Sequence, residues 1–249
     1  GEQLADRNGV ACGQVGDRIA GRWPADPARA AAAPDPSSVR ALNEWEGKQL
    51  LQRAGLAIPA GELVHSEAQA HAAAEVIGYP VVLKAVSETL LHKTEAGAVR
   101  LGCRSEEDVA RAFRDLARLS DTVLVEEMVT DAVAELIVGV TRDPRLGPTL
   151  VVGAGGVLVE LLEDTRTLLL PAAAAEIEAA LLSLKAAKLL NGFRRKPPGD
   201  IKAAVSAVLA IARFAVENAG RLAELDVNPL LVRPQGKGAV AADVLIVMS

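Results

Sequence analysis

One stretch of the chain, residues 78–102, constrains the fold more than any other. It reads Gly-Tyr-Pro-Val-Val-Leu-Lys-Ala-Val-Ser-Glu-Thr-Leu-Leu-His-Lys-Thr-Glu-Ala-Gly-Ala-Val-Arg-Leu-Gly. The apolar run after the Gly-Tyr-Pro turn predicts a buried strand that ends by presenting Lys84. A second apolar run, residues 98–103, predicts the returning strand of a hairpin. Because a buried ammonium group requires a strong anion beside it, Lys84 indicates an anion-binding position.

The loop of this hairpin contains His92, which the two strands would hold over the same space as Lys84. A solvated lysine and an ordinary histidine on a surface loop explain the two residues equally well. The pair on its own leaves both interpretations open.

Three segments differ in their patterning. Residues 1–38 are rich in Gly, Ala and Pro and lack periodicity, which predicts a flexible leader or linker. Residues 39–120 alternate between helical and strand patterns, with Ser66 and Ser105 each placed to open a helix. Residues 121–249 contain apolar runs at close intervals, which predict an antiparallel sheet.

The second half also contains two helical patterns and a final hairpin. The predicted helices are 172–190 and 200–219, the second with Asp200 as its N-cap, and the predicted hairpin strands are 222–232 and 239–247. We therefore expect a two-lobed α+β protein, with lobes 39–120 and 121–249 and a cleft between them.

Residues 224–229, Glu-Leu-Asp-Val-Asn-Pro, alternate strictly between polar and apolar side chains. On a strand, Glu224, Asp226 and Asn228 share one face, and oxygen ligands side by side suit a hard cation such as Mg²⁺. If the turn has an even number of residues, Asp243 lies on the same face as Asn228. With the two-residue turn Gln235-Gly236, the two residues lie directly opposite each other. A solvated polar strand face would also explain this pattern.

Glu126 and Glu127 end the predicted strand that starts near residue 122. They could form a hinge where main-chain groups and a carboxylate meet a nucleotide base or ribose. An exposed acidic pair is the alternative.

Composition excludes some classes of protein. A net charge of −5 without a basic block argues against nucleic-acid binding. No apolar run reaches the ~18 residues that a membrane span needs. Two isolated cysteines and the lack of a visible signal peptide lead us to expect a reducing, cytoplasmic compartment.

Four segments in this order carry a family resemblance. They are Gly78-Tyr-Pro-Val-Val-Leu-Lys84, Leu91-His-Lys-Thr-Glu-Ala-Gly97, Glu135-Leu-Ile-Val-Gly-Val-Thr-Arg-Asp-Pro144 and Glu224-Leu-Asp-Val-Asn-Pro-Leu230. Residues 39–247 resemble the ATP-grasp domain of the NDP-forming acyl-CoA synthetases, relatives of the succinyl-CoA synthetase β subunit. The chain departs from the family pattern at Ala98 and Arg195, where glycine is usual.

The resemblance implies an ATP-grasp fold with a nucleotide cleft between the lobes, and ATP/ADP and Mg²⁺ as cofactors. Lys84 resembles the lysine that grips the phosphates, and His92 the histidine that some members phosphorylate. The adenine hinge would be Glu126, Glu127, Met128 and Val129. The magnesium ligands would be Asn228 and Asp243, with Asp226 close by.

The implied activity is that of an ADP-forming acid–thiol ligase: acyl-CoA + ADP + phosphate ⇌ acid + CoA + ATP. The chain would pass a phosphoryl group between a phosphohistidine and ADP. Acid and CoA would bind through a CoA-binding, α-type ligase subunit or domain, in a hetero-oligomer without nucleic acid or membrane. Another ATP-grasp carboxylate–amine ligase, or a nucleotide-binding module without chemistry, are the alternatives.

Overall fold

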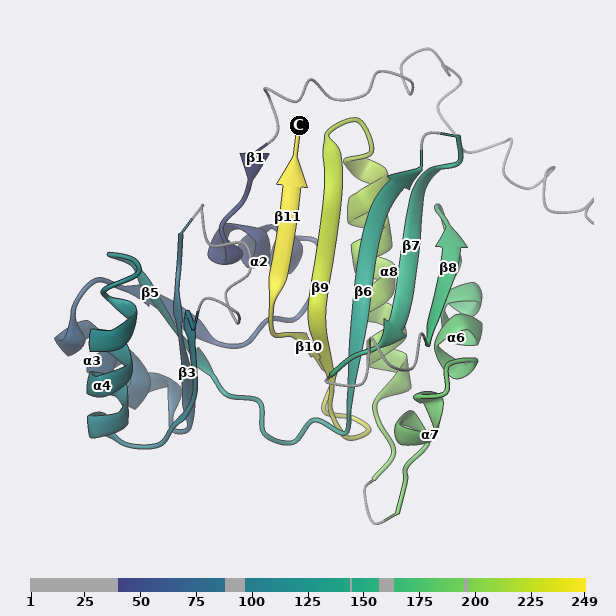
Figure 1. The fold of residues 1–249 in the computed structure, drawn as a ribbon. Coiled ribbons are helices and arrows are strands. Elements are labelled where there is room, and N and C mark those ends of the chain that lie inside the picture. Colours follow the sequence, from purple (N-terminus) through teal and green to yellow (C-terminus); the bar gives the residue numbers. More distant parts are fainter. Residues whose placement is uncertain (1–39, 88–96, 144, 157–163, 195–196) are drawn as a thin grey trace, which may run out of the picture. The chain divides into compact units, whose positions relative to one another are not determined.

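The computed structural model describes residues 40–87, 97–143, 145–156, 164–194 and 197–249. Their strands form two antiparallel sheets, one of four strands and one of seven (Figure 1). No helix in these ranges has the length and apolarity needed to cross a membrane.

The four-stranded sheet has the order β2-β5-β3-β4. Its strands are β2 (Gly61–Val64), β5 (Val123–Glu127), β3 (Val81–Ala85) and β4 (Val99–Cys103). Helices α3 (Glu67–Ile77) and α4 (Glu106–Leu116) pack against it and bury an apolar cluster that includes Leu83, Val109 and Leu116. The predicted hairpin around residues 78–103 is confirmed, since β3 and β4 pair antiparallel.

Both helices of this sheet begin where the sequence predicts. The side chain of Ser66 accepts a hydrogen bond from the amide of Gln69, and Ser105 accepts one from Asp108. The side chains of Gln69 and Asp108, the third residues of the two helices, accept hydrogen bonds from the amides of His65 and Arg104. In a capping box, this side chain would instead accept from the amide of the N-cap serine, one residue later in the chain.

The seven-stranded sheet has the order β1-β11-β9-β6-β7-β8, with β10 paired to β9. Its strands are β1 (Arg40–Ala41), β6 (Ala134–Asp143), β7 (Gly147–Ala154), β8 (Thr165–Leu169), β9 (Leu222–Val232), β10 (Ala239–Ala241) and β11 (Val244–Met248). Helices α2 (Glu44–Arg53), α6 (Ala174–Leu182), α7 (Ala187–Leu190) and α8 (Ile201–Glu217) accompany it. Their apolar side chains and those of the sheet form one core, which includes Leu51, Ile177 and Ile211.

Two segments belong to a different sheet from the one we expected. Strand β5, expected to open the second lobe, pairs with β2 and β3. Residues 40–41, within the expected first lobe, form strand β1, which the sequence analysis did not predict and which pairs with β11. Sheet membership therefore does not follow a boundary at residue 120. The division into lobes, and the leader 1–38 outside the described residues, stay predictions.

The single helix predicted for residues 172–190 is wrong, because the chain forms α6 and α7 with a break between them. Arg166 donates from Nε to the hydroxyl of Ser183 and from Nη2 to its carbonyl oxygen, at 2.9 and 2.8 Å. Asp164, almost fully buried, accepts a hydrogen bond from the amide of Ala186 at 2.9 Å. These contacts, made by residues in or next to β8, stabilise the end of α6 and the start of α7, although the local sequence favours one continuous helix.

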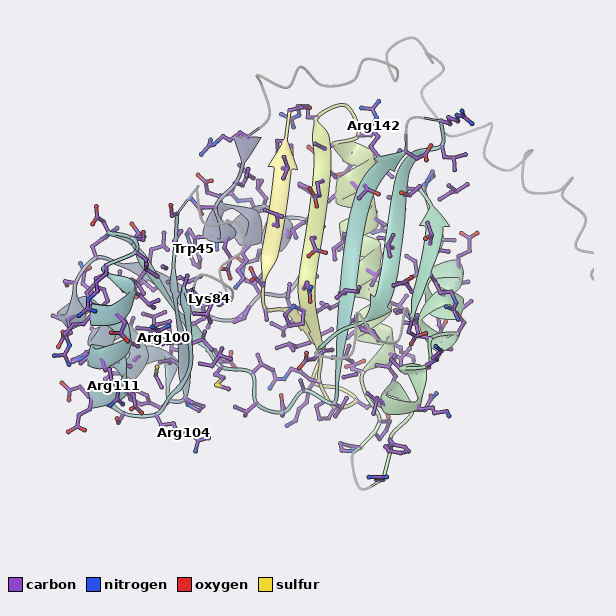
Figure 2. The ribbon with its side chains drawn as sticks, viewed as in Figure 1. Trp45, Lys84, Arg100, Arg104, Arg111 and Arg142 are labelled. Carbon is purple, nitrogen blue, oxygen red and sulfur yellow. The ribbon has the colours of Figure 1, made fainter. Side chains whose placement is uncertain are left out.

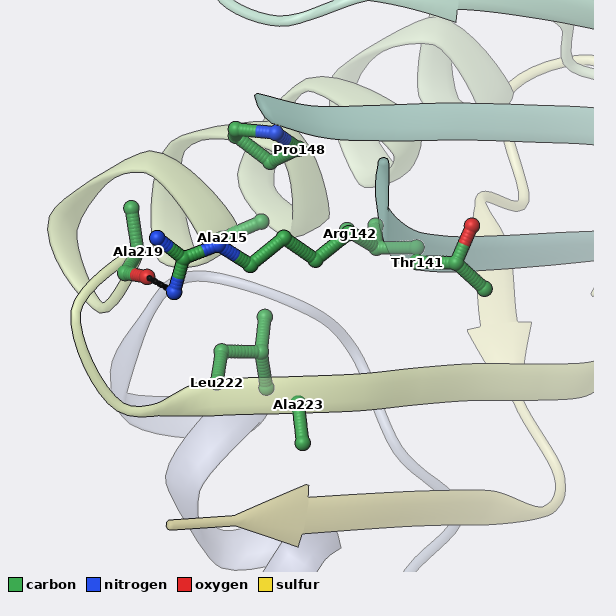
Figure 3. Close-up of a pocket in the computed structure, with 8 residues that line it drawn as sticks. Thr141, Arg142, Pro148, Ala215, Ala219, Leu222 and Ala223 are labelled. Carbon is green, nitrogen blue, oxygen red and sulfur yellow. Dashed lines mark hydrogen bonds between the residues drawn. The ribbon is translucent and has the colours of Figure 1, made fainter. Parts of the chain in front are cut away.

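Helix α8 is held at both ends. Asp200 accepts from the amide of Ala203 and from the amides of Gly236 and Gly238 in the turn after β9, so one carboxylate caps the helix and fixes the turn. At the other end, the Arg142 guanidinium lies 3.4 Å from the carbonyl oxygen of Ala219 (Figure 3). The hollow beside Arg142 measures about 10 Å³, room for about one water molecule.

Candidate functional site

Lys84, labelled in Figure 2, projects from β3 into a buried group of charges. Its Nζ lies 2.6 Å from Oε1 of Glu44 on α2 and 3.0 Å from Oε2 of Glu126 on β5. It also donates to the main-chain oxygen of Ala242 at 2.7 Å. Lys84 therefore joins the four-stranded sheet to α2 and to the segment between β10 and β11.

Lys48 completes this group. Its Nζ lies 2.8 Å from Oε1 of Glu44 and also contacts Oε1 of Glu126. The exposed fractions are 1% for Glu44, 0% for Lys48, 6% for Lys84 and 2% for Glu126. We call these four residues the buried quartet. With both lysines protonated, its charges cancel, which allows burial that single charges would not tolerate.

The two lysines respond differently to this environment. Burial lowers the pKa of Lys84, but the carboxylates of Glu44, Glu126 and Asp243 outweigh it and hold that pKa above its ordinary value. Burial and the neighbouring ammonium of Lys84 lower the pKa of Lys48. Lys84 is thus the stronger fixed cation of the two.

Sequence analysis identified Lys84 and Glu126 but missed Glu44 and Lys48. A signal was present: a glutamate and a lysine four residues apart lie on the helix face that also carries Leu51. Charged residues on the apolar stripe of a helix indicate buried partners. The partners themselves lie far along the chain, on β3 and β5.

The predicted hinge is only partly available for a base. The Glu126 side chain is engaged by the two lysines. The amide of Glu127 donates to Ala60 and that of Met128 to Pro80, at 2.8 and 3.1 Å. A base bound along 126–129 would therefore depend on carbonyl oxygens or on main-chain groups beyond Met128. The hinge role of Glu126, Glu127, Met128 and Val129 stays a prediction.

The polar face of β9 has the predicted arrangement. Leu225 and Val227 are buried, whereas Glu224 and Asn228 are exposed and Asp226 is half-buried between them. Asp243 lies opposite Asn228 in the strand register. Before it, Ala241 pairs with Leu230, and after it, Val244 pairs with Val227. The main chains agree, because the Asn228 amide donates to the Asp243 carbonyl oxygen at 3.2 Å. The two-residue turn Gln235-Gly236 is confirmed, because the amide of Lys237 donates a hydrogen bond to the carbonyl oxygen of Pro234.

The residues of this face fit a magnesium ion that is shared with phosphates. Burial, then the nearby carboxylates of Glu224 and Asp243, raise the pKa of Asp226 to about 6, so a cation here would relieve unfavourable negative charge. Gly139 of β6 pairs with Asp226, and a Cβ there would lie 3.6 Å from its Oδ1. Among the described residues, no three His, Cys, Asp or Glu side chains form a metal cluster of their own. Mg²⁺ commonly takes one or two carboxylates and completes its shell with phosphate oxygens and water.

The structure thus brings two of the predicted groups close together. Ala242, which accepts from Lys84, directly precedes Asp243. His92 and Arg195 lie outside the described residues, so their predicted roles stay untested.

Comparison with known proteins decides the family. A family model described as an ATP-grasp domain matches residues 36–248. The chain belongs to the ATP-grasp family. This confirms the resemblance seen in the sequence, and the two antiparallel sheets with their helices are an ATP-grasp fold.

Relatives of this ATP-grasp protein include ADP-forming acyl-CoA ligases. The β subunit of acetate–CoA ligase (ADP-forming) II of Pyrococcus furiosus is 34% identical over 218 residues, which cover 84% of this chain and 92% of that subunit. A trans-feruloyl-CoA synthase of an unknown prokaryotic organism is 36% identical over 214 residues, 82% of this chain. The chain spans only 30% of the length of that synthase, and 30% of a 4-hydroxybutyrate–CoA ligase (ADP-forming) of Nitrosopumilus maritimus.

Solved structures of the dinucleotide-forming acetyl-coenzyme A synthetase 1 of Ca. Korarchaeum cryptofilum have the same fold. One, in complex with coenzyme A and Ca-AMPCP, has a TM-score of 0.79 at 36% identity and covers 84% of this chain and 94% of its own. Another contains Mg-AMPPCP, with a phosphohistidine segment pointing towards the nucleotide binding site.

Proposed function

We propose that this ATP-grasp protein is the nucleotide-binding part of an ADP-forming acyl-CoA synthetase, using ATP/ADP and Mg²⁺. The whole enzyme would catalyse acyl-CoA + ADP + phosphate ⇌ acid + CoA + ATP. The contact of Lys84 with the residue before Asp243 supports this proposal most strongly. This contact brings Lys84, which would hold a phosphate oxygen, next to the segment that carries Asp243, which would bind Mg²⁺.

Each group would have a defined task. Lys84 would hold a phosphate oxygen, while Asn228 and Asp243, with Asp226 nearby, would hold Mg²⁺. When bound, Mg²⁺ would neutralise charge on the phosphates, and phosphoryl transfer depends mainly on such positioning and neutralisation. The main chain around Glu127–Val129 would contact the base.

His92 would act as the phosphoryl relay, because a neutral imidazole is a competent nucleophile near pH 7. An imidazole nitrogen of His92 would form a P–N bond as the P–N bond of a partner's phosphohistidine breaks. An oxygen of the ADP β-phosphate would then take the phosphoryl group and form ATP. Both steps conserve the phosphoryl group and need no further reactant.

A CoA-binding, α-type subunit or domain would supply the acid and CoA sites. We infer this partner because the Pyrococcus furiosus relative is named a β subunit. The chain and this partner would form a hetero-oligomer in the cytoplasm.

The test is reconstitution. We would combine the chain with the α subunit of an ADP-forming acetate–CoA ligase and measure ATP formed from acetyl-CoA, ADP and phosphate. His92→Asn should abolish ATP formation, whereas His65→Asn, at an exposed histidine, should leave it unchanged. Full turnover by His92→Asn would remove the relay. Amine-dependent ATP hydrolysis without CoA would instead indicate a carboxylate–amine ligase.

A further inference from the structure

The ammonium of Lys84 has no hydrogen left for a phosphate. A protonated lysine carries three donors, and Lys84 lies within hydrogen-bond distance of Glu44, Glu126 and Ala242. To hold a phosphate oxygen, Lys84 must therefore release at least one of these partners. If it releases a glutamate, that carboxylate stays in a buried place and needs another cation.

Lys48 is placed to be that cation. It contacts the same two carboxylates, Glu44 and Glu126, and its side chain is 0% exposed. An ammonium without solvent exposure is not presented to a ligand that enters from solvent. Lys48 therefore acts on the carboxylates rather than on the nucleotide.

We propose that Lys48 is a positioning residue for phosphate binding: it keeps Glu44 and Glu126 paired while Lys84 exchanges a carboxylate for a phosphate oxygen. The inference rests on the proposed function. Without Lys48, both carboxylates compete with the phosphate for one ammonium, and Lys84 stays bound to them. With Lys48 present, its ammonium stays paired with both carboxylates, so Lys84 can release one of them.

This role differs from a purely structural one in what it affects. Loss of packing around α2 would weaken every part of nucleotide binding by a similar factor. Loss of the positioning role would weaken binding of the phosphates and leave binding of the nucleoside unchanged. The comparison of Mg·ATP with adenosine separates the two.

The experiment measures dissociation constants of Mg·ATP and adenosine by equilibrium dialysis with the full chain. Lys48→Met should weaken Mg·ATP binding by about ten- to a hundredfold, the loss expected for a charged hydrogen bond, and change adenosine binding less than about twofold. Lys202→Met, at an exposed lysine of α8, is the matched control and should change neither. Unchanged Mg·ATP binding in folded Lys48→Met, or equal losses for both ligands, would overturn the inference.

A second variant keeps the test decisive if Lys48→Met fails to fold. Lys48→Met/Glu44→Gln removes one charge of each sign, so Lys84 can release the neutral amide at position 44 and stay paired with Glu126. It should bind Mg·ATP within about threefold of the wild type, a difference of less than 1 kcal/mol. A tenfold or larger loss of Mg·ATP binding in this variant would overturn the inference. A wild-type chain that binds no Mg·ATP would overturn the proposed function as well.

Discussion

The Nζ atom of Lys84 lies 2.7 Å from the main-chain oxygen of Ala242. This hydrogen bond connects the end of β3 in the four-stranded sheet to the residue that precedes Asp243, in the segment between β10 and β11 of the seven-stranded sheet. The candidate phosphate-binding and metal-binding groups are therefore neighbours, although 158 residues separate them along the chain.

The buried quartet predicts a strong effect of Lys84 on stability. Lys84→Met leaves Glu44 and Glu126 sharing one ammonium in a buried place. Removing one partner of a buried ion pair typically costs about 3–5 kcal/mol, so we expect a loss of that order in the free energy of unfolding, measured with urea.

A charge-balanced variant is the control for this prediction. Lys84→Met/Glu44→Gln removes one positive and one negative charge and should be more stable than the single variant by at least about 1 kcal/mol. A single variant as stable as the wild type would show that the quartet does not stabilise the fold.

The raised pKa of Asp226 predicts a pH effect. Burial and the carboxylates of Glu224 and Asp243 raise this pKa from 3.8 to about 6, so the folded chain binds the proton more tightly than the unfolded chain. The free energy of unfolding should fall as the pH rises from about 4 to about 6 and stay low above that range. Because Asp226 is only partly buried, we expect about 1 kcal/mol after solvent screening.

Asp226→Asn should remove this part of the pH dependence and stabilise the metal-free chain at pH 7. Urea unfolding at pH 4, 5, 6 and 7 checks it, with Glu178→Gln, at an exposed carboxylate of α6, as the control. A variant whose stability varies with pH as in the wild type would contradict the assignment.

Asp200 should stabilise the fold by more than an ordinary helix cap, because it also binds the turn after β9. Its carboxylate accepts from Ala203 at 3.1 Å and from Gly236 and Gly238 at 2.9 and 3.0 Å. Asp200→Ala should therefore cost about 2–3 kcal/mol, against about 1 kcal/mol for Ser105→Ala, which loses one capping bond to the amide of Asp108. Thermal unfolding of both variants tests the difference, and equal costs would show that the turn contacts contribute nothing.

Local sequence signals predicted the parts of the fold that depend on near neighbours. Ser66, Ser105 and Asp200 cap helices as expected, because a cap involves residues within one helical turn. The position of Asp243 opposite Asn228 also followed from local information, since a two-residue turn fixes the register of the strands on both sides.

Contacts between distant segments were beyond such signals. Nothing near Glu44 indicates that it meets Lys84, or that Lys48 meets Glu126 78 residues later. The break after α6 depends on Arg166 and Asp164, which the helical pattern of residues 172–190 does not include. For the same reason the sequence analysis assigned β5 to the second lobe, whereas it pairs with β2 and β3. An apolar run does not reveal its pairing partners.

The central claim is that Lys84 and Asp243 act on the phosphates of one bound nucleotide. Calorimetric titration of Mg·ATP into the wild type, Lys84→Met, Asp243→Asn and the double variant tests it most directly. We predict one-to-one binding to the wild type, weaker binding in each single variant, and a double variant whose loss differs from the sum of the single losses by at least about 1 kcal/mol. Equal binding by all four proteins, or losses that add within about 0.3–0.5 kcal/mol, would contradict the claim.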